Sequence, residues 1–240
     1  MSKFQFHRFT GDVSFRCCGA PPQFDRRTES EVRRIWDDAL RDPARNLSDN
    51  MVLAVMHAGE TIEATQIPYR YVFAQSQRPE LFVPPLKALA VSGILLSKDR
   101  YVLGRRAQWV SQDPGALELV PSGSVDADLM SDDGRIDLKG QFDEEVCEEL
   151  GIGKDAVGGH SILGLVDDVD KHVMDVVVRA ALRCTWPQLV EAHSQLERPE
   201  YSDLVSLTKA KIRQMIERGS DGISEVSTAI FTHFCAEVEL

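Results

Sequence analysis

Five acidic side chains crowd the end of one predicted helix, and their spacing suits metal binding. Residues 143–152 read DEEVCEELGI. At about 100° per residue, Glu145, Glu148 and Glu149 lie on one helix face. Like charges four residues apart each cost a few tenths of a kcal/mol, and anions at a helix C-terminus cost roughly 0.3–1 kcal/mol. A hard divalent cation would compensate this repulsion. The alternative is a solvated acidic surface.

The predicted elements around this helix alternate between strands and helices. Mixed elements without a regular repeat favour an α/β sandwich. The helix should run from about Asp137 to Leu150, where Gly151 ends it. Before it we expect strands at Leu86–Leu96, Tyr101–Gly104 and Ala116–Val120, with a turn at residues 97–100 and a loop at 121–124. After it we expect strands at Ser161–Val166 and His172–Cys184, then helices at Trp186–Gln195, Thr208–Arg218 and Ser224–Ala236.

The first 85 residues have a different pattern and are predicted to form a small α+β extension. An amphipathic helix should start near Thr28 and end before Pro43. Strands are expected at Met51–His57 and Glu63–Ala74, joined by a turn at residues 58–60. The proline-containing stretch at 75–85 reads as a linker. We therefore predict an extension over 1–85 and a second domain over 86–240.

The acidic helix resembles part of the box of the Nudix hydrolase family, G-x5-E-x7-R-E-U-x-E-E-x-G-U, in which U is a bulky aliphatic residue. The match runs from Glu145 through Ile152. Residues 117–124, LELVPSGS, are similar to the strand and glycine turn of the family, and residues 102–106, VLGRR, to the strand before that turn. The resemblance covers residues 86–240 and implies a Nudix-like α/β/α sandwich with a mixed sheet.

The first half of the box departs from this pattern. Glu144 occupies the arginine position, and it follows Gly123 by 21 residues, seven more than the pattern has. The extra residues should loop out at the turn signal Asp133-Gly134. The first glutamate of the box would fall at Ile136, beside Asp137 as a shorter substitute.

Carried over position by position, the resemblance implies a metal site and a reaction. Glu145, Glu148 and Glu149 would be the catalytic residues and would ligate Mg²⁺ or Mn²⁺, and Gly123 would add its backbone carbonyl. In the family, the glutamate that matches Glu149 is often linked to water activation. The implied reaction is hydrolysis of the diphosphate linkage in a nucleoside diphosphate joined to another moiety, of nucleotide-sugar or dinucleotide type. Candidates for a further acidic ligand from a later loop are Glu197, Glu200 and Asp203.

Other side chains could bind the substrate. Arg105 or Arg106 could clamp a phosphate, and because strand neighbours face opposite ways we expect only one of them to reach it. Both could instead be solvated surface residues. Trp109 could stack on a base or simply anchor a loop. Tyr69 and Tyr71 are expected to pack within the N-terminal sheet.

Composition narrows the classes of partner. The net charge of −11 argues against broad nucleic-acid binding, which requires cationic side chains, but leaves a small phosphorylated substrate open. No apolar run is long enough to span a membrane, and the start lacks the apolar stretch of a secretory signal. We expect a cytoplasmic protein that does not bind membranes. Its five cysteines read as reduced thiols.

Two alternatives concern activity and assembly. The broken first half of the box would also fit a catalytically silent Nudix-like domain that binds a nucleotide or a protein. The three intact glutamates argue against that alternative. Members of the family often form homodimers, and the N-terminal extension could serve that purpose.

Overall fold

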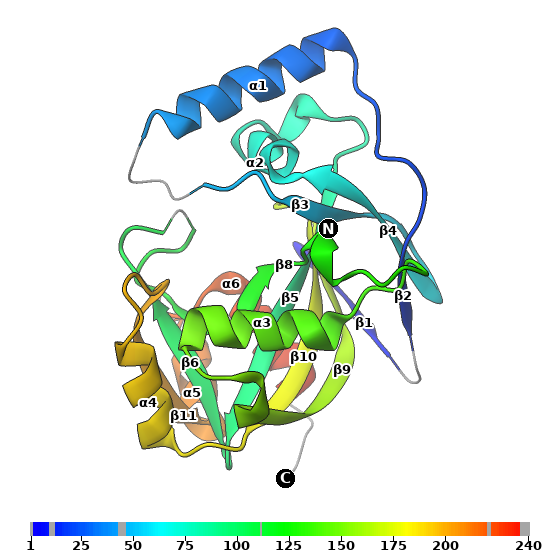
Figure 1. Cartoon of the computed structure of the whole chain (residues 1–240). Helices are drawn as coiled ribbons and strands as arrows, with labels where there is room; N and C mark the ends of the chain where they lie inside the picture. Colours follow the sequence, from blue (N-terminus) through cyan, green and yellow to red (C-terminus); the bar gives the residue numbers. More distant parts are fainter. Residues whose placement is uncertain (1, 10–12, 43–46, 111, 220–221, 236–240) are drawn as a thin grey trace.

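In a computed structural model, the protein has a mixed sheet at its centre (Figure 1). The structure describes residues 2–9, 13–42, 47–110, 112–219 and 222–235. Its strands are β1 (Phe4–Arg8), β2 (Ser14–Cys17), β3 (Met51–Ala58), β4 (Thr61–Pro68), β5 (Lys87–Ser97), β6 (Arg100–Arg106), β7 (Leu117–Leu119), β8 (Ser122–Ser124), β9 (Val157–Asp168), β10 (Val173–Leu182) and β11 (Tyr201–Thr208).

The strands pair in the order β1-β9-β10-β5-β3-β4-β2, with β6 and β8 also paired to β5, and β7 and β11 paired to β6. The β5–β10 and β2–β4 pairs are parallel, whereas the other pairs are antiparallel. The helices are α1 (Arg26–Leu40), α2 (Tyr69–Gln77), α3 (Leu138–Leu150), α4 (Trp186–Ser194), α5 (Lys209–Glu217) and α6 (Glu225–Ile230), which continues into a π-helical turn at Phe231–Cys235.

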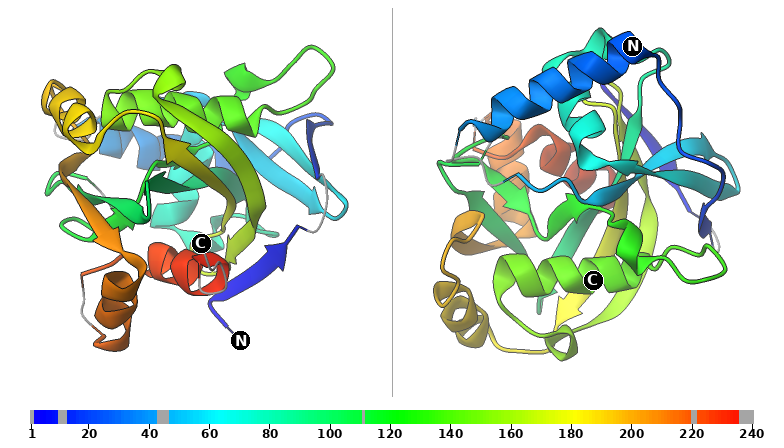
Figure 2. Two further views of the ribbon diagram at one scale, coloured as in Figure 1. Left: turned by 90° about the horizontal axis from the view of Figure 1, so that it is seen from below. Right: turned by 45° about the horizontal axis from the view of Figure 1, so that its top comes forward.

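Helices cover both faces of the central strands. Alternate residues of β10 belong to different cores: Val176 and Val178 pack in the cluster that holds α3, and Val177 packs with residues of α5 and α6. Because successive side chains of a strand point to opposite faces, α3 and α5–α6 lie on opposite sides of the sheet. Figure 2, left, shows α3 and α6 separated by the strands. The predicted α/β/α sandwich with a mixed sheet is confirmed.

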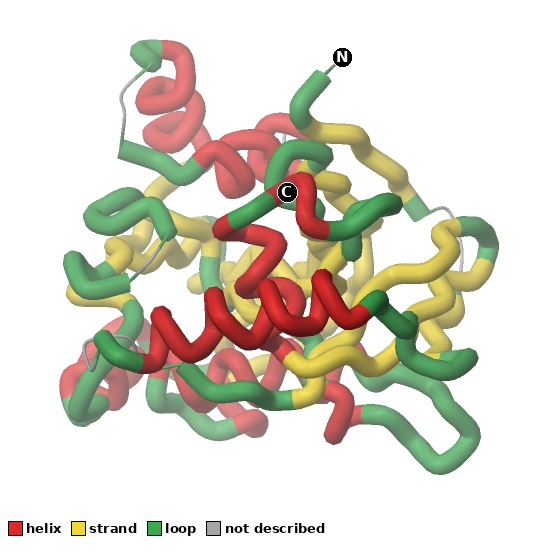
Figure 3. Tube along the Cα trace, turned by 90° about the horizontal axis from the view of Figure 1, so that it is seen from above, coloured by secondary structure: helices red, strands yellow, loops and turns green. Residues whose placement is uncertain are grey.

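The N-terminal segment has a hydrophobic cluster of its own. It joins Val32, Ile35 and Trp36 of α1 to Ala54 of β3 and Phe73 of α2. Seen from above, α1 lies across the top of the strands (Figure 3). The segment is continuous with the rest of the sheet, since β3 pairs with β5 and β1 with β9. The division at residue 85 stays a prediction.

Most predicted elements are present, and two predictions are wrong. The stretch 75–85, expected as a linker, begins inside α2, which ends at Gln77, and contains a 3-10 turn at Pro79–Leu81. The stretch expected as a single strand over Glu63–Ala74 leaves the sheet at Pro68 and continues as α2. Tyr69 and Tyr71 therefore lie on a helix and not in the N-terminal sheet. The β-branched and aromatic residues around these tyrosines favour a strand locally. A helix forms instead because it buries Tyr71 and Phe73 in the same hydrophobic cluster as α1. The short strands β1, β2 and β8 and the eight-residue strand β11 were not expected.

Two further expectations concern the whole chain. All five cysteines are free in the structure, and their reduced state stays a prediction. Within the described residues, no helix combines the length and apolar character needed to cross a membrane.

Candidate active site

Helix α3 aims its acidic face at the β8 turn. Asp137 caps its start by accepting a hydrogen bond from the Gly140 N–H at 3.0 Å, and Gly151 ends it with a left-handed φ of 72°. Phe142, Val146 and Leu150 are buried in the core. The neighbouring face of the helix presents Glu145 and Glu149 toward Ser122 and Gly123.

Glu145 lies directly against Gly123. A Cβ atom at Gly123 would overlap the Glu145 carboxylate, so only glycine leaves room for that side chain. The amide of Gln141 donates to Glu145 Oε1 at 2.7 Å and accepts from the Asp126 N–H at 2.9 Å. Gln141 thus fixes the carboxylate from one turn earlier on the helix.

Glu149 is buried beside the same β8 turn, next to Ser122. Only 6% of its surface is exposed, and it accepts a hydrogen bond from the Ser122 N–H at 3.1 Å. The hydroxyl of Tyr201, from β11, lies 3.5 Å from Glu149 Oε1 and 3.2 Å from Glu118 Oε2. Because a hydroxyl has a single proton, it can donate to one of these carboxylates at a time.

One arginine accompanies these carboxylates. Arg106 donates to Glu118 at 2.8 Å and lies 3.6 Å from Glu200. Arg105, its neighbour on β6, is exposed and donates to the Gly115 carbonyl at 3.0 Å. The alternation expected of a strand places Arg106 beside the acidic cluster and Arg105 on the outside.

Burial and like charge disfavour the ionised form of the carboxyl groups in this cluster. Burial, together with the charges of Glu148, Asp126 and Glu200, raises the pKa of Glu145 to about 7, despite its hydrogen bond from Gln141. Burial and the charge of Glu145 raise the pKa of Glu149 well above its usual range. Burial also raises the pKa of Glu118, although Arg106 opposes that shift. The carboxylates therefore outnumber the cationic groups that face them.

Glu148 takes a different direction from its two partners on α3. It is exposed, and its charge contributes to the raised pKa of Asp126, for which burial is the main cause. Among the residues that the structure describes, no three His, Cys, Asp or Glu side chains are already gathered closely enough to hold a metal ion. The site brings Glu145, Glu149 and Gly123 together, while Glu148 lies at its edge.

The donor set nevertheless fits a hard divalent cation. Glu145 and Glu149 present carboxylate oxygens, which Mg²⁺ and Mn²⁺ prefer, beside a glycine that leaves their approach open. The repulsion between the two side chains is the feature that a bound cation would relieve.

The departures from the family box have local explanations. Asp137, considered as a substitute for the first glutamate, caps α3. Glu144, at the arginine position, faces Lys154 at 3.4 Å. The extra residues form the loop before α3, which turns at Gly134 with φ 78°.

Sequence reasoning missed Glu118, Tyr201 and Gln141. Among the three acidic residues considered for the later loop, Glu200 is the one near the cluster, because its charge acts on Glu145 and Glu149. Gln141 is four residues before Glu145, a spacing that could have indicated their contact. Nothing in the sequence indicated that Glu118 and Tyr201 would meet.

An aromatic side chain lies near this cluster. Trp109 is 39% exposed, and the guanidinium of Arg198 lies 4.2 Å from its ring centre. The Ala107 N–H donates to the Glu200 carbonyl at 2.7 Å, which ties the segment before Trp109 to the segment after Arg198. The charge of Glu200 also acts on Tyr69 of α2, whose pKa is raised mainly by burial.

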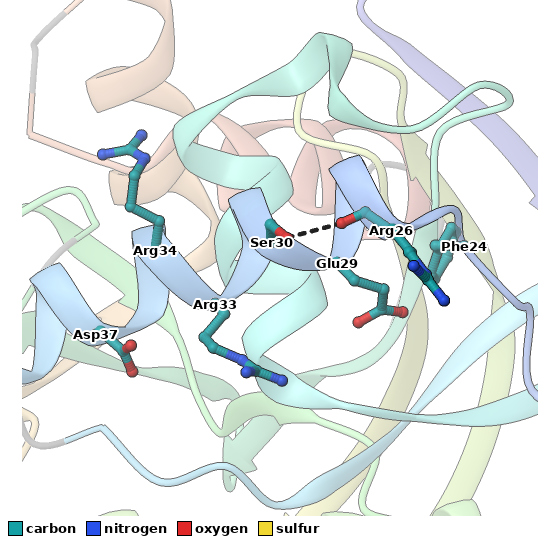
Figure 4. Close-up of a pocket in the computed structure, with 7 residues that line it drawn as sticks. All are labelled: Phe24, Arg26, Glu29, Ser30, Arg33, Arg34 and Asp37. Atoms are coloured by element: carbon teal, nitrogen blue, oxygen red, sulfur yellow. Dashed lines mark hydrogen bonds between the residues drawn. The ribbon is translucent and has the colours of Figure 1, made fainter.

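A separate surface hollow of about 520 Å³ lies along α1 (Figure 4). Arg26, Arg33 and Arg34 line it together with Glu29 and Asp37. In Figure 4 the Ser30 hydroxyl bonds to the Arg26 carbonyl, at 2.8 Å. Cationic and anionic groups alternate here, so the hollow has no evident preference for a charged ligand.

No family model and no curated protein matches this sequence. The structure is similar to that of a Nudix hydrolase from Nitrosomonas europaea, at 11% identity and a TM-score of 0.43, over 62% of this chain and 89% of that one. It is also similar to a bifunctional NMN adenylyltransferase/ADP-ribose pyrophosphatase from Francisella tularensis, complexed with AMP and a manganese ion, at 16% identity, a TM-score of 0.44 and coverages of 68% and 45%. A Nudix-family hydrolase from Clostridium perfringens gives 14% identity, a TM-score of 0.36 and coverages of 61% and 94%. The names of the Nitrosomonas europaea and Clostridium perfringens proteins include the family that the acidic helix resembles.

Proposed function

We propose that this protein is a Nudix-type pyrophosphohydrolase that requires Mg²⁺ or Mn²⁺. Its proposed substrates are nucleoside diphosphates linked to another moiety, of nucleotide-sugar or dinucleotide type. The observation that carries the proposal is the convergence of Glu145 and Glu149 on the Ser122–Gly123 turn. The two glutamates match positions in the second half of the family box, and Gly123 belongs to the turn that is similar to the glycine turn of the family, seven residues further from the helix than in the box.

Glu145, Glu149 and Glu148 would hold the divalent cation, with the Gly123 carbonyl as a further ligand. A cation bound there supplies an activated water and neutralises charge that develops on phosphorus. Glu148 is exposed at the edge of the cluster, and its charge acts on Glu145 and Asp126.

The remaining side chains would bind the phosphates of the substrate and orient the carboxylates of the site. Arg106 is the proposed phosphate ligand, held in place by Glu118, and Arg105 is exposed for a more distant phosphate. Gln141 orients the carboxylate of Glu145, and Tyr201 spans Glu118 and Glu149. Burial of Glu149 and Tyr201 keeps bulk water away from this side of the cluster.

The proposal extends to the whole chain. Residues 86–240 would form the catalytic unit and residues 1–85 an extension of it. The net charge of −11 supports a small-molecule substrate in place of a nucleic acid. A cytoplasmic location and a homodimer remain part of the proposal.

The test is a substrate panel with mass detection of the products. Pure protein is incubated with nucleotide sugars, ADP-ribose, NAD, CoA and dinucleoside polyphosphates, with Mg²⁺, with Mn²⁺ and with EDTA. We expect metal-dependent formation of two phosphorylated products, and loss of turnover in Glu149→Gln and Glu145→Gln. Glu144→Gln, which removes a charge from the same helix outside the cluster, should keep its turnover.

Two results would count against this assignment. Turnover that persists unchanged in Glu149→Gln would place the active site elsewhere. Metal-independent thermal stabilisation by a nucleotide, with no product from any substrate, would favour the silent binding domain.

A further inference from the structure

A second hollow, far from the acidic cluster, is lined by cations. It has a volume of about 800 Å³, within the usual range of roughly 300–1,000 Å³ for small-molecule pockets. The turn between β5 and β6, the end of β10, the start of α4 and the strand β11 surround it. In Figure 1 this is the lower end of the molecule, where the β5–β6 turn and α4 lie.

The cations of this hollow lack acidic partners. Lys98, Arg100 and Arg183 line it, and none of the three forms an ion pair with any residue that the structure describes. Within the described part of the chain, the hydrogen bonds of the Arg100 side chain go to neutral groups, the hydroxyl and the carbonyl of Ser206. In a chain with a net charge of −11, Lys98 and Arg100, together with Arg183, whose guanidinium lies over Gly158 of β9, make a local field at this hollow that attracts anions.

The rest of the lining suits a ring. Trp186 is half-buried at the start of α4, and Leu182 and Leu204 pack in the same cluster as Trp186 and supply an apolar wall. A guanidinium binds phosphate through two parallel hydrogen bonds, and an indole stacks on planar groups. The N-terminal turn of α4 adds partial positive charge on the same side.

We propose that this hollow binds a small phosphorylated molecule with a planar ring, of the nucleoside monophosphate class, without a metal ion. The site is distinct from the proposed active site. Arg100, at the start of β6, lines the hollow, and Arg106, at the end of the same strand, contacts the acidic cluster. Six residues of strand span about 20 Å, so the two sites are separated by about that distance. β11 connects the same two places through Tyr201 and Ser206.

The test measures binding in EDTA, so that a metal-dependent active site does not contribute. Equilibrium dialysis is run with AMP, with pyrophosphate as the anion alone and with adenosine as the ring alone. Tryptophan fluorescence is followed in parallel. We expect AMP to bind more tightly than either fragment and to change the fluorescence, and we expect Trp186→Phe to abolish that change.

Charge removal gives the decisive comparison. Arg100→Ala with Arg183→Ala should weaken AMP binding by roughly tenfold or more. The matched control is Arg26→Ala with Arg33→Ala, which removes two cations from the hollow on α1 and should bind AMP normally. Lys98→Gly is a milder variant, because glycine suits the left-handed φ of 58° at this turn. It should also weaken AMP binding, and it replaces the double variant if that protein does not fold.

Three results would overturn the proposal: no AMP binding in EDTA, equal binding of adenosine and AMP, or unchanged binding in the folded Arg100 and Arg183 variants. Glu149→Gln should leave AMP binding in EDTA intact. Because that variant removes hydrolysis, failure of this proposal is distinguishable from failure of the proposed function.

Discussion

At the scale of single residues, close packing is what defines the candidate site. Gly123 carries no chemistry, yet its missing side chain is the space that Glu145 occupies. Gln141 has no charge, yet it is the donor that orients the same carboxylate. The precision of the site therefore depends on neighbours as much as on the acidic side chains.

Gly123→Ala should remove activity while the protein stays folded. The added Cβ would displace the Glu145 carboxylate, and a misplacement of about 1 Å in a catalytic group costs about 100-fold in rate. Steady-state kinetics on the substrate found in the panel measures the loss. Gly153→Ala is the control, since nothing lies within 4 Å of its added Cβ. Normal kinetics in Gly123→Ala would show that Glu145 does not act from this position.

Gln141→Met should raise the metal concentration needed for half-maximal activity. Methionine keeps the length of the side chain but cannot donate to Glu145, and loss of such a supporting contact costs about 10–100-fold in metal affinity or activity. A titration of activity with Mg²⁺ measures the change. Gln214→Met, on the exposed side of α5, is the matched control. An unaltered metal titration would rule out a positioning role for Gln141.

At the scale of elements, the ends of α3 follow from the sequence, while its environment does not. Asp137 and Gly151 fix the two ends through local hydrogen bonding and backbone conformation, which is why they were predictable. The strand expected over 63–74 was wrong because residues 69–77 gain more by packing under α1 as a helix. Strand β8 has no apolar pattern, and its pairing with β5 defines it.

Asp137 should prove to be a helix cap and not a metal ligand. Asp137→Ala removes the acceptor for Gly140 and should lower the free energy of unfolding by about 1 kcal/mol. Asp137→Asn keeps an acceptor and should retain both stability and the metal dependence of turnover. Urea denaturation and a metal titration of both variants provide the measurements. A large rise in metal requirement for Asp137→Asn, with stability unchanged, would assign the carboxylate to the metal instead.

At the scale of the whole molecule, a buried carboxyl on the other face of the sheet makes stability depend on pH. Burial raises the pKa of Asp175 to about 7, although Ser92 donates to it at 2.9 Å. A carboxyl with a raised pKa in the folded state holds its proton there longer than in the unfolded chain. Its contribution to stability is therefore full below pH 4 and is lost as the pH rises through 7.

Asp175→Asn should consequently be more stable than the parent protein at pH 8, by a few kcal/mol as an order of magnitude, and similar to it at pH 4. Urea denaturation of both proteins from pH 4 to pH 8 measures the difference. Because the other carboxylates are common to both proteins, their titration cancels in the comparison. A difference in stability that stays constant across this range would contradict the assignment.

The sequence by itself determined the acidic helix, its two ends, the glycine turn that precedes it and the alternation of Arg105 and Arg106. These features follow from local periodicity, capping and strand geometry, which act over a few residues. Only the tertiary structure decided that Glu118, Tyr201 and Glu200 join the cluster, that Glu148 faces outward and that three cations surround a second hollow. Those contacts join residues far apart in the chain, and the pairing of β6 with β7 and β11 is what brings them together.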